Sequence, residues 1–95
     1  MYQSLSFVTN TVLWVKGEGN YTRLVTAGEQ FLIRAYLSEM LLKLPVDIFL
    51  RVHKSYGINL KAVEEIRPTC VLIEDAEVPV YQAYRPEMTR CFERH

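Results

Sequence analysis

The sequence has few of the features that most directly identify a function. Its 11 Lys and Arg residues are balanced by 11 Asp and Glu residues, so it lacks the basic excess typical of domains that bind nucleic acid without sequence preference. No run of about 18 apolar residues is present, so no membrane-spanning segment is expected. The first four residues, MYQS, do not form a basic segment followed by an apolar one, so no signal peptide is expected either.

Cysteine and histidine are also scarce. Cys70 and Cys91 form no C-x-x-C pair, so we expect reduced thiols in a cytoplasmic protein and no zinc site. The histidines are His53 and His95, so a catalytic triad would depend on His53 alone. Ser55 is too close to it in sequence to support a nucleophile–base pair, and no G-x-S-x-G or phosphate-binding glycine loop is present. We therefore expect neither an enzyme nor a bound cofactor or metal.

What the sequence does contain is a series of short β-forming segments, in a chain whose 95 residues are 49% apolar and suffice for one domain with a small core. Gly-, Pro- and Asn-containing turns separate these segments. Strands are expected at residues 11–16, 21–26, 30–34, 49–52, 63–67, 70–74 and 78–80. Trp14, in the first of them, is expected in the core, and residues 53–60 are expected to form a loop.

Two segments have helical periodicity instead. In residues 37–44, leucine and methionine recur at i, i+3, i+4 and i+7, which predicts a two-turn helix that Pro45 ends. In residues 84–92, apolar side chains recur at i, i+4, i+7 and i+8, which predicts a C-terminal helix with Pro86 near its start.

The segment after the strand at residues 49–52 carries an unusual density of polar groups. His53, Lys54, Ser55, Tyr56 and Asn59 supply an imidazole, a cation, two hydroxyls and an amide within seven positions. Such groups suit phosphate oxygens and base edges. The same residues are also typical of a turn whose side chains satisfy buried backbone groups. The composition of the segment leaves both interpretations open.

Four segments of the chain together resemble the LytTR DNA-binding domain family. Residues 49–60, FLRVHKSYGINL, resemble its pattern F-x-R-V-H-R/K-S-Y/F-I-V-N. The other three are residues 12–24 (VLWVKGEGNYTRL), 37–45 (LSEMLLKLP) and 78–84 (VPVYQAY), which resemble its opening strand–loop–strand, its L-x-E-L-x-x-x-L-P helix and its I-P-V-S-R-x-Y segment. Their order and spacing are those of the family, and together they cover roughly residues 12–92.

The resemblance implies a mainly β domain, an elongated arrangement of about ten short strands in three small antiparallel sheets with one or two short helices. In that family loops, rather than a recognition helix, enter successive major grooves of double-stranded DNA, at sites arranged as paired repeats. The loops here would be residues 19–21, 53–56 and 81–85. The family acts in bacterial transcription regulation, usually joined to the receiver domain of a two-component response regulator, and a homodimer could form on the DNA.

Ten residues are the candidate DNA contacts on this basis: Asn20, Tyr21, Arg51, His53, Lys54, Ser55, Tyr56, Asn59, Gln82 and Arg85. Asn20 would meet a base edge, and Lys54 a guanine edge or a phosphate. Ser55 and Tyr56 would meet the DNA backbone. We expect His53 mainly to fix the conformation of its loop through a hydrogen bond.

The chain departs from the family pattern at three positions. Gln82 replaces an Arg that contacts DNA, and its amide is better suited to adenine. Gly57 replaces an apolar β-branched residue, which predicts a more flexible loop after Tyr56. Tyr81 replaces a Ser. The missing Arg and the zero net charge favour a second hypothesis, a LytTR-like protein-interaction or dimerisation module with weakened DNA binding.

Overall fold

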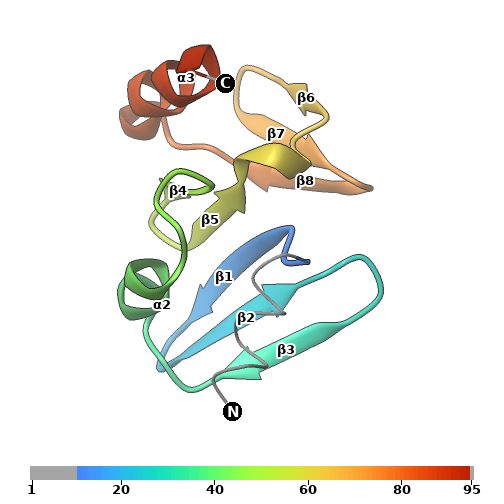
Figure 1. Ribbon diagram of the computed structural model, residues 1–95, viewed down its shortest axis with the longest axis vertical. Helices are drawn as coiled ribbons and strands as arrows, with labels where there is room; N and C mark the ends of the chain where they lie inside the picture. Colours follow the sequence, from blue (N-terminus) through green and yellow to red (C-terminus); the bar gives the residue numbers. More distant parts are fainter. Residues whose placement is uncertain (1–10, 95) are drawn as a thin grey trace.

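A computed structural model describes residues 11–94. The expectations for residues 1–4 and for His95 concern residues outside this range. The molecule measures 36 × 25 × 24 Å along its principal axes, and two antiparallel sheets follow one another along the longest of them (Figure 1). No helix within residues 11–94 is long and apolar enough to cross a membrane.

The first sheet has five strands in the order β3-β2-β1-β5-β4. Its strands are β1 (Trp14–Glu18), β2 (Tyr21–Val25), β3 (Gln30–Ile33), β4 (Phe49–His53) and β5 (Tyr56–Asn59). The second sheet has three strands, β6 (Glu65–Ile66), β7 (Cys70–Ile73) and β8 (Ala76–Pro79), in sequence order. The helices are α2 (Leu37–Lys43), α3 (Arg85–Arg94) and two short 3₁₀ segments, η1 (Leu60–Ala62) and η2 (Gln82–Tyr84).

Two apolar clusters form the core, one on each side of the β4–β5 hairpin. One cluster joins the five-stranded sheet to α2 through Val12, Val15, Leu24, Phe49, Leu37, Met40 and Leu44. The other joins β4 and β5 to the second sheet and α3 through Val52, Ile58, Leu60, Val71, Ile73, Val78, Val80, Met88 and Cys91. Because successive strand residues point to opposite faces, β4 contributes Phe49 to one cluster and Val52 to the other.

Much of the expected secondary structure is confirmed. The first three strands, the strands on either side of residues 68–69, the helix that ends before Pro45 and the C-terminal helix are all present, and the strands pair as a β1–β2–β3 meander and a β6–β7 hairpin. The numbers of strands and sheets were wrong, since residues 11–94 form eight strands in two sheets rather than about ten in three. Trp14 is half-buried and packs against the second apolar cluster.

The expected loop at residues 53–60 was also wrong. Only Lys54 and Ser55 form the turn, and the chain then returns as β5 between β1 and β4. Gly57 lies in the middle of β5 and is buried, so it does not loosen a loop. A Cβ at this position would lie 2.9 Å from Leu41 Cδ2 and 3.1 Å from Val15 Cγ2. Glycine therefore allows α2 to pack closely against the sheet.

Candidate nucleic-acid interface

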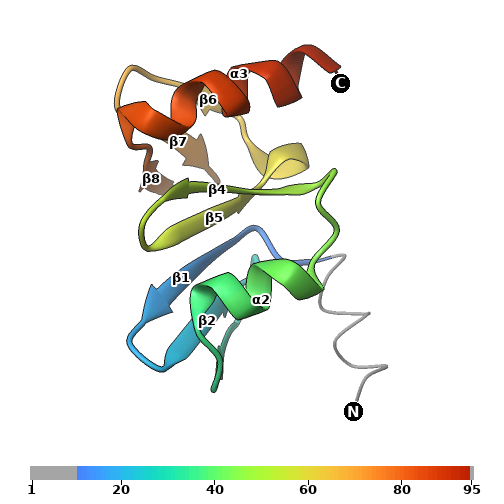
Figure 2. The same ribbon diagram turned by 90° about the vertical axis from the view of Figure 1, so that its left-hand side faces the viewer.

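The three expected loops lie along one edge of the molecule. Figure 2 shows the β1–β2 turn, the β4–β5 turn and the start of α3 on the same side, one above the other. Backbone hydrogen bonds fix their spacing. The Gly17 N–H donates to the Ser55 carbonyl (2.8 Å), and the Tyr81 N–H donates to the Val52 carbonyl (2.8 Å). The second turn is thus tied to the strand of the first turn on one side and to the third loop on the other.

Polar side chains build the β4–β5 turn from within. The Arg51 guanidinium donates from Nε to the His53 carbonyl (3.2 Å) and from Nη2 to the Lys54 carbonyl. The Ser55 N–H donates to His53 Nδ1 (3.0 Å), which is the kind of hydrogen bond expected of His53. Arg51, His53 and Ser55 are half-buried, whereas Lys54 is exposed at the tip. Arg51 and His53 therefore shape the turn that presents Lys54.

Aromatic rings connect this turn to its neighbours. The His53 ring lies 3.9 Å from the Tyr81 ring, centroid to centroid, and meets Tyr56 edge-on at 5.3 Å. Tyr56 in turn lies 5.9 Å from Trp14, and Lys16 Nζ lies 5.8 Å from the Tyr56 ring centroid. Tyr56 is half-buried in this row, so its ring mainly supports the surface.

The β1–β2 turn has a different construction. Gly19 adopts a positive φ of 65°, a conformation that suits glycine as the first residue of a two-residue hairpin turn. Asn20 and Tyr21 are exposed, and within residues 11–94 the Asn20 side chain makes no hydrogen bond. The backbone of Gly19 therefore provides the shape of this turn, and the side chains of Asn20 and Tyr21 remain exposed beside it.

An ion pair closes the base of that turn. Arg23 Nε and Nη2 donate to the two carboxylate oxygens of Glu18 at 2.8 and 2.9 Å. This hydrogen bonding holds the pKa of the Glu18 carboxyl below its usual value and raises the pKa of Arg23. Arg23 is consequently paired with an acid and is not counted among the cations available to DNA.

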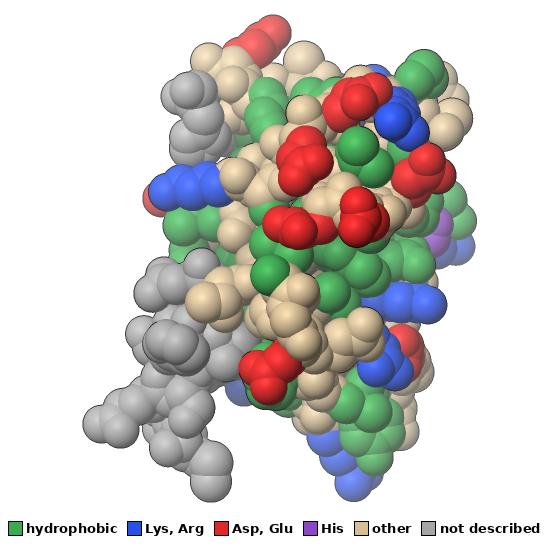
Figure 3. All heavy atoms as spheres, turned by 90° about the vertical axis from the view of Figure 1, so that its right-hand side faces the viewer, with side chains coloured by type: hydrophobic (Ala, Val, Ile, Leu, Met, Phe, Trp, Pro, Cys, Tyr) green, Lys and Arg blue, Asp and Glu red, His purple; other side chains and the backbone are tan. Residues whose placement is uncertain are grey.

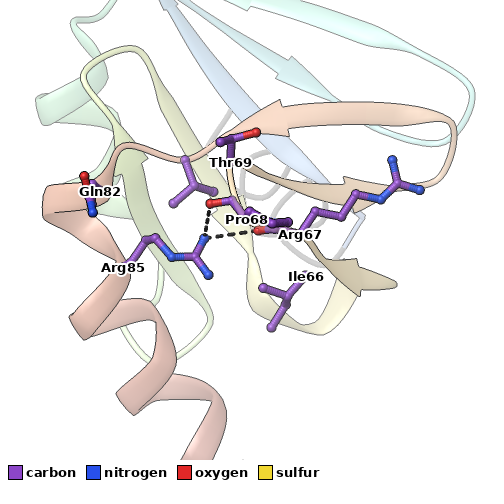
Figure 4. Close-up of a pocket in the computed structure, with 7 residues that line it drawn as sticks. Ile66, Arg67, Pro68, Thr69, Gln82 and Arg85 are labelled. Carbon is purple, nitrogen blue, oxygen red and sulfur yellow. Dashed lines mark hydrogen bonds between the residues drawn. The ribbon is translucent and has the colours of Figure 1, made fainter.

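The third loop combines one exposed residue with one engaged residue. Gln82 begins η2 and is exposed. Arg85 is half-buried and donates from Nη1 to the carbonyls of Arg67 (3.1 Å) and Pro68 (3.0 Å), across a hollow of about 600 Å³ (Figure 4). Gln82 lines the same hollow from η2. Arg85 therefore holds the third loop against the β6–β7 turn.

Asn59, also a predicted DNA contact, lies at the end of β5 that is opposite the β4–β5 turn. Its side chain is 9% exposed. Its Nδ2 donates to the Val12 carbonyl (2.8 Å), and its Oδ1 accepts from the Lys61 N–H (2.9 Å) at the start of η1. With both polar atoms bonded inside the protein, Asn59 holds the chain before β1 against the end of β5.

Two side chains that were not among the predicted contacts also lie at this edge. Tyr81 is 44% exposed and touches His53, and Lys16 is half-buried beside Tyr56. The sequence marks Tyr81 only as a departure from the family pattern and does not mark Lys16, because both contacts join residues of different strands or loops. Only the antiparallel register, which pairs Lys16 with Tyr56, and the return of the chain after β8 bring them together.

Charge is distributed unevenly over the molecule. Five of the ten exposed acids within residues 11–94 belong to the second sheet and its flanking residues: Glu64, Glu65, Glu74, Asp75 and Glu77. In Figure 3, Asp and Glu side chains gather on the upper half of a face turned away from the one seen in Figure 2. Residues 51–63, which hold the β4–β5 turn, contain no acid. A net charge of zero thus coexists with an edge that carries few acids.

The comparison with protein families decides the assignment. A model of the LytTr DNA-binding domain matches residues 3–93. The chain belongs to the LytTR family of DNA-binding domains. This family is one of DNA-binding domains, so membership assigns this chain to DNA binding.

Two curated relatives are similar to this chain in sequence, and one solved structure is similar to it in fold. The relatives are the heme-containing CO-sensing transcriptional regulators RcoM 1 and RcoM 2 of Paraburkholderia xenovorans (strain LB400), each 36% identical over 72 residues, which cover 68% of this chain and 27% of the relative. The chain therefore spans about a quarter of their length. A LytTr DNA-binding domain of a putative methyl-accepting/DNA response regulator from Bacillus cereus has the same fold, with a TM-score of 0.80, 21% identity, and coverage of 88% of this chain and 83% of that one.

Proposed function

We propose that this LytTR domain binds double-stranded DNA sequence-specifically by placing its three loops in successive major grooves. The observation that carries the proposal is the alignment of the three loops on one edge, held together by backbone hydrogen bonds (Figure 2). Narrow protrusions that carry exposed donors and acceptors can enter a major groove and read base edges.

The proposed DNA contacts are four exposed residues of this edge and the half-buried Ser55. Asn20 reads a base edge, Lys54 meets a guanine edge or a phosphate, and Gln82 reads adenine. Tyr21 and Ser55 contact the DNA backbone. Arg51, His53, Tyr56 and Arg85 act mainly by holding the loops in place, because their polar groups or rings are engaged within the protein.

The domain is proposed to act as the DNA-reading part of a cytoplasmic bacterial regulator, on sites arranged as paired repeats that recruit two copies. A receiver domain of a two-component system is the sensory part expected from the sequence. The curated relatives are named as heme-containing CO sensors, so a ligand-sensing domain is the second form proposed for that part.

Selection of binding sites from random duplexes, followed by titrations at several salt concentrations, tests the proposal. If about three to five phosphates are neutralised, the log–log slope of affinity against salt should lie roughly between −3 and −5. The slope is modest because the interface uses few unpaired cations. Failure to select any sequence, or a salt-independent complex, would contradict DNA binding by this edge.

The neutral net charge and Gln82 in place of Arg favour one alternative, a domain that has become a protein-interaction or dimerisation module. Sedimentation of the chain with and without the selected duplex separates the two proposals. A module would self-associate without DNA and show no sequence preference. A DNA reader would assemble in pairs only on a duplex with two repeats.

A further inference from the structure

Tyr81 is the most exposed aromatic side chain of the β4–β5 and η2 region, at 44%, and its position is fixed on two sides. Its N–H donates to the Val52 carbonyl, and its ring packs on His53 with centroids 3.9 Å apart and planes tilted by 46°. Val52 and His53 belong to β4, so Tyr81 is anchored to the strand that leads into the second loop. A ring held in this way presents apolar surface at little further cost in conformational entropy.

The location of this ring restricts what it can recognise. Tyr81 directly precedes Gln82, the exposed residue of the third loop. In the major groove, the thymine C5 methyl is the apolar group that base edges present, and apolar side chains contact it. Stacking on a base would require that base to leave the helix, which costs a few kcal/mol. An apolar ring beside an amide therefore suits an A·T-containing step.

We propose that Tyr81 is a specificity-determining residue that contacts the C5 methyl group of a thymine in the groove entered by the third loop. This inference rests on the proposed function, since it assumes that the loop enters a major groove. Tyr81 and Gln82 then read neighbouring groups, a methyl and an adenine edge. The tyrosine that replaces the family's serine thus adds apolar readout where the arginine of the pattern is missing.

Replacement of thymine by uracil removes only the methyl group and tests the contact directly. The selected duplex is prepared with uracil at each thymine position in turn and titrated with the wild-type chain. We expect one position at which uracil weakens binding about fourfold, the effect of exposing one buried methyl. Unchanged affinity at every position, while the unmodified site is still bound specifically, overturns the inference and leaves the proposed function standing.

Two variants assign the methyl contact to Tyr81. Tyr81→Phe keeps the ring and should keep the uracil sensitivity at that position. Tyr81→Ser should bind thymine and uracil duplexes equally, with its melting temperature measured to confirm folding. If Tyr81→Ser does not fold, the uracil scan of the wild type and of Tyr81→Phe still decides. Loss of affinity in Tyr81→Phe equal to that in Tyr81→Ser would instead assign the contact to the hydroxyl group and overturn the inference.

Discussion

The β1–β2 turn and the β4–β5 turn end neighbouring hairpins on the same edge, but they obtain their shape in different ways. In the β1–β2 turn, Gly19 adopts a positive φ and the side chain of Asn20 remains unbonded within the described residues. In the β4–β5 turn, the side chains of Arg51 and His53 bond to the turn's own backbone. One turn is shaped by its backbone and the other by its side chains.

The difference shows that polar residues in a binding motif serve two purposes. A turn shaped by glycine leaves its polar side chains available for DNA. A turn shaped by side chains is more firmly held but uses part of its polar set internally, so only Lys54 projects freely from it. Substitutions should therefore separate residues that support the interface, which act through stability, from residues that read DNA, which act through binding alone.

The largest effect is expected from Asn59→Ala, at the base of β5. It removes two buried hydrogen bonds and leaves the Val12 carbonyl and the Lys61 N–H without these partners. The free energy of unfolding should fall by about 2–4 kcal/mol. Denaturant titration measures this loss, and DNA affinity measured well below the melting temperature should be unchanged. Weakened binding by the fully folded variant would return Asn59 to the DNA contacts.

Gln82→Arg should sharpen the role of the third loop, which rests on the β4–β5 turn through Tyr81. Arg can hold the O6 and N7 atoms of guanine together, so affinity for duplexes with guanine at the contacted position should rise by about 1–3 kcal/mol. Titrations against duplexes that vary at single positions measure the change. Thr89→Arg, at an exposed position of α3 outside the three loops, is the matched control for charge. If wild type and Gln82→Arg have the same affinity for every duplex, Gln82 does not contact a base.

His53→Ala should weaken stability and binding together, because it removes the acceptor for the Ser55 N–H and the ring that supports Tyr81. We expect a loss of about 1–2 kcal/mol in the free energy of unfolding, seen as a lower melting temperature. His53→Asn is the control, since an Asn side chain can accept from the N–H two residues later. Reduced binding with an unchanged melting temperature would make His53 a reader rather than a support.

Asn20→Ala is the counterpart of Asn59→Ala, since it removes a side-chain amide from the β1–β2 turn, whose shape comes from its backbone. Stability should change by less than about 0.5 kcal/mol, as for exposed positions without partners. Affinity for the selected duplex should fall by about 1 kcal/mol, the low end for an amide–base contact, because Asn20 has no hydrogen-bonded support. Calorimetric melting and titration measure the two quantities. A clear drop in stability would contradict the contrast between the turns.

The smallest effect concerns pH at the base of the β1–β2 turn. The Arg23 hydrogen bonds lower the folded-state pKa of Glu18 below its ordinary value. The pair therefore stabilises the fold above that ordinary value, and this contribution is lost as the pH falls through the lowered pKa. Melting temperatures of wild type and Glu18→Gln should therefore differ at neutral pH and converge in acid. Glu29→Gln is the control, at an exposed glutamate of the β2–β3 turn that has no ion pair within residues 11–94. A constant difference across the pH range would exclude the pair as its source.

Some of the secondary-structure elements could be predicted from the sequence, and others could not, for physical reasons. The spacing of Leu37, Met40 and Leu44 predicted α2, because a helix places them on one face. β5 was not predicted, because Gly57 is atypical of a strand. Glycine suits this position because a Cβ there would crowd the Leu41 side chain. The pairing of β5 with β1 is a non-local property that local patterns do not contain.

For the same reason, the sequence did not show which polar residues support the interface and which remain free to contact DNA. Asn59 looked like part of the polar motif, yet its partner Val12 lies 47 positions earlier. The contact of His53 with Tyr81 likewise joins residues from different elements. The three loops that the family resemblance pointed to lie on one edge of the folded chain. Which of their side chains remain free could be decided only from the hydrogen bonds of the folded chain.

The β4–β5 hairpin packs into both apolar clusters, with Phe49 on one side and Val52 and Ile58 on the other. Neither cluster can open without exposing residues of this hairpin, so the two sheets should melt as one cooperative unit rather than in sequence. The slowest amide hydrogen exchange should then occur in β4 and β5, at the centre of the molecule. The strand proposed to carry the second loop into DNA is thus also expected to be the part of the domain best protected against local opening.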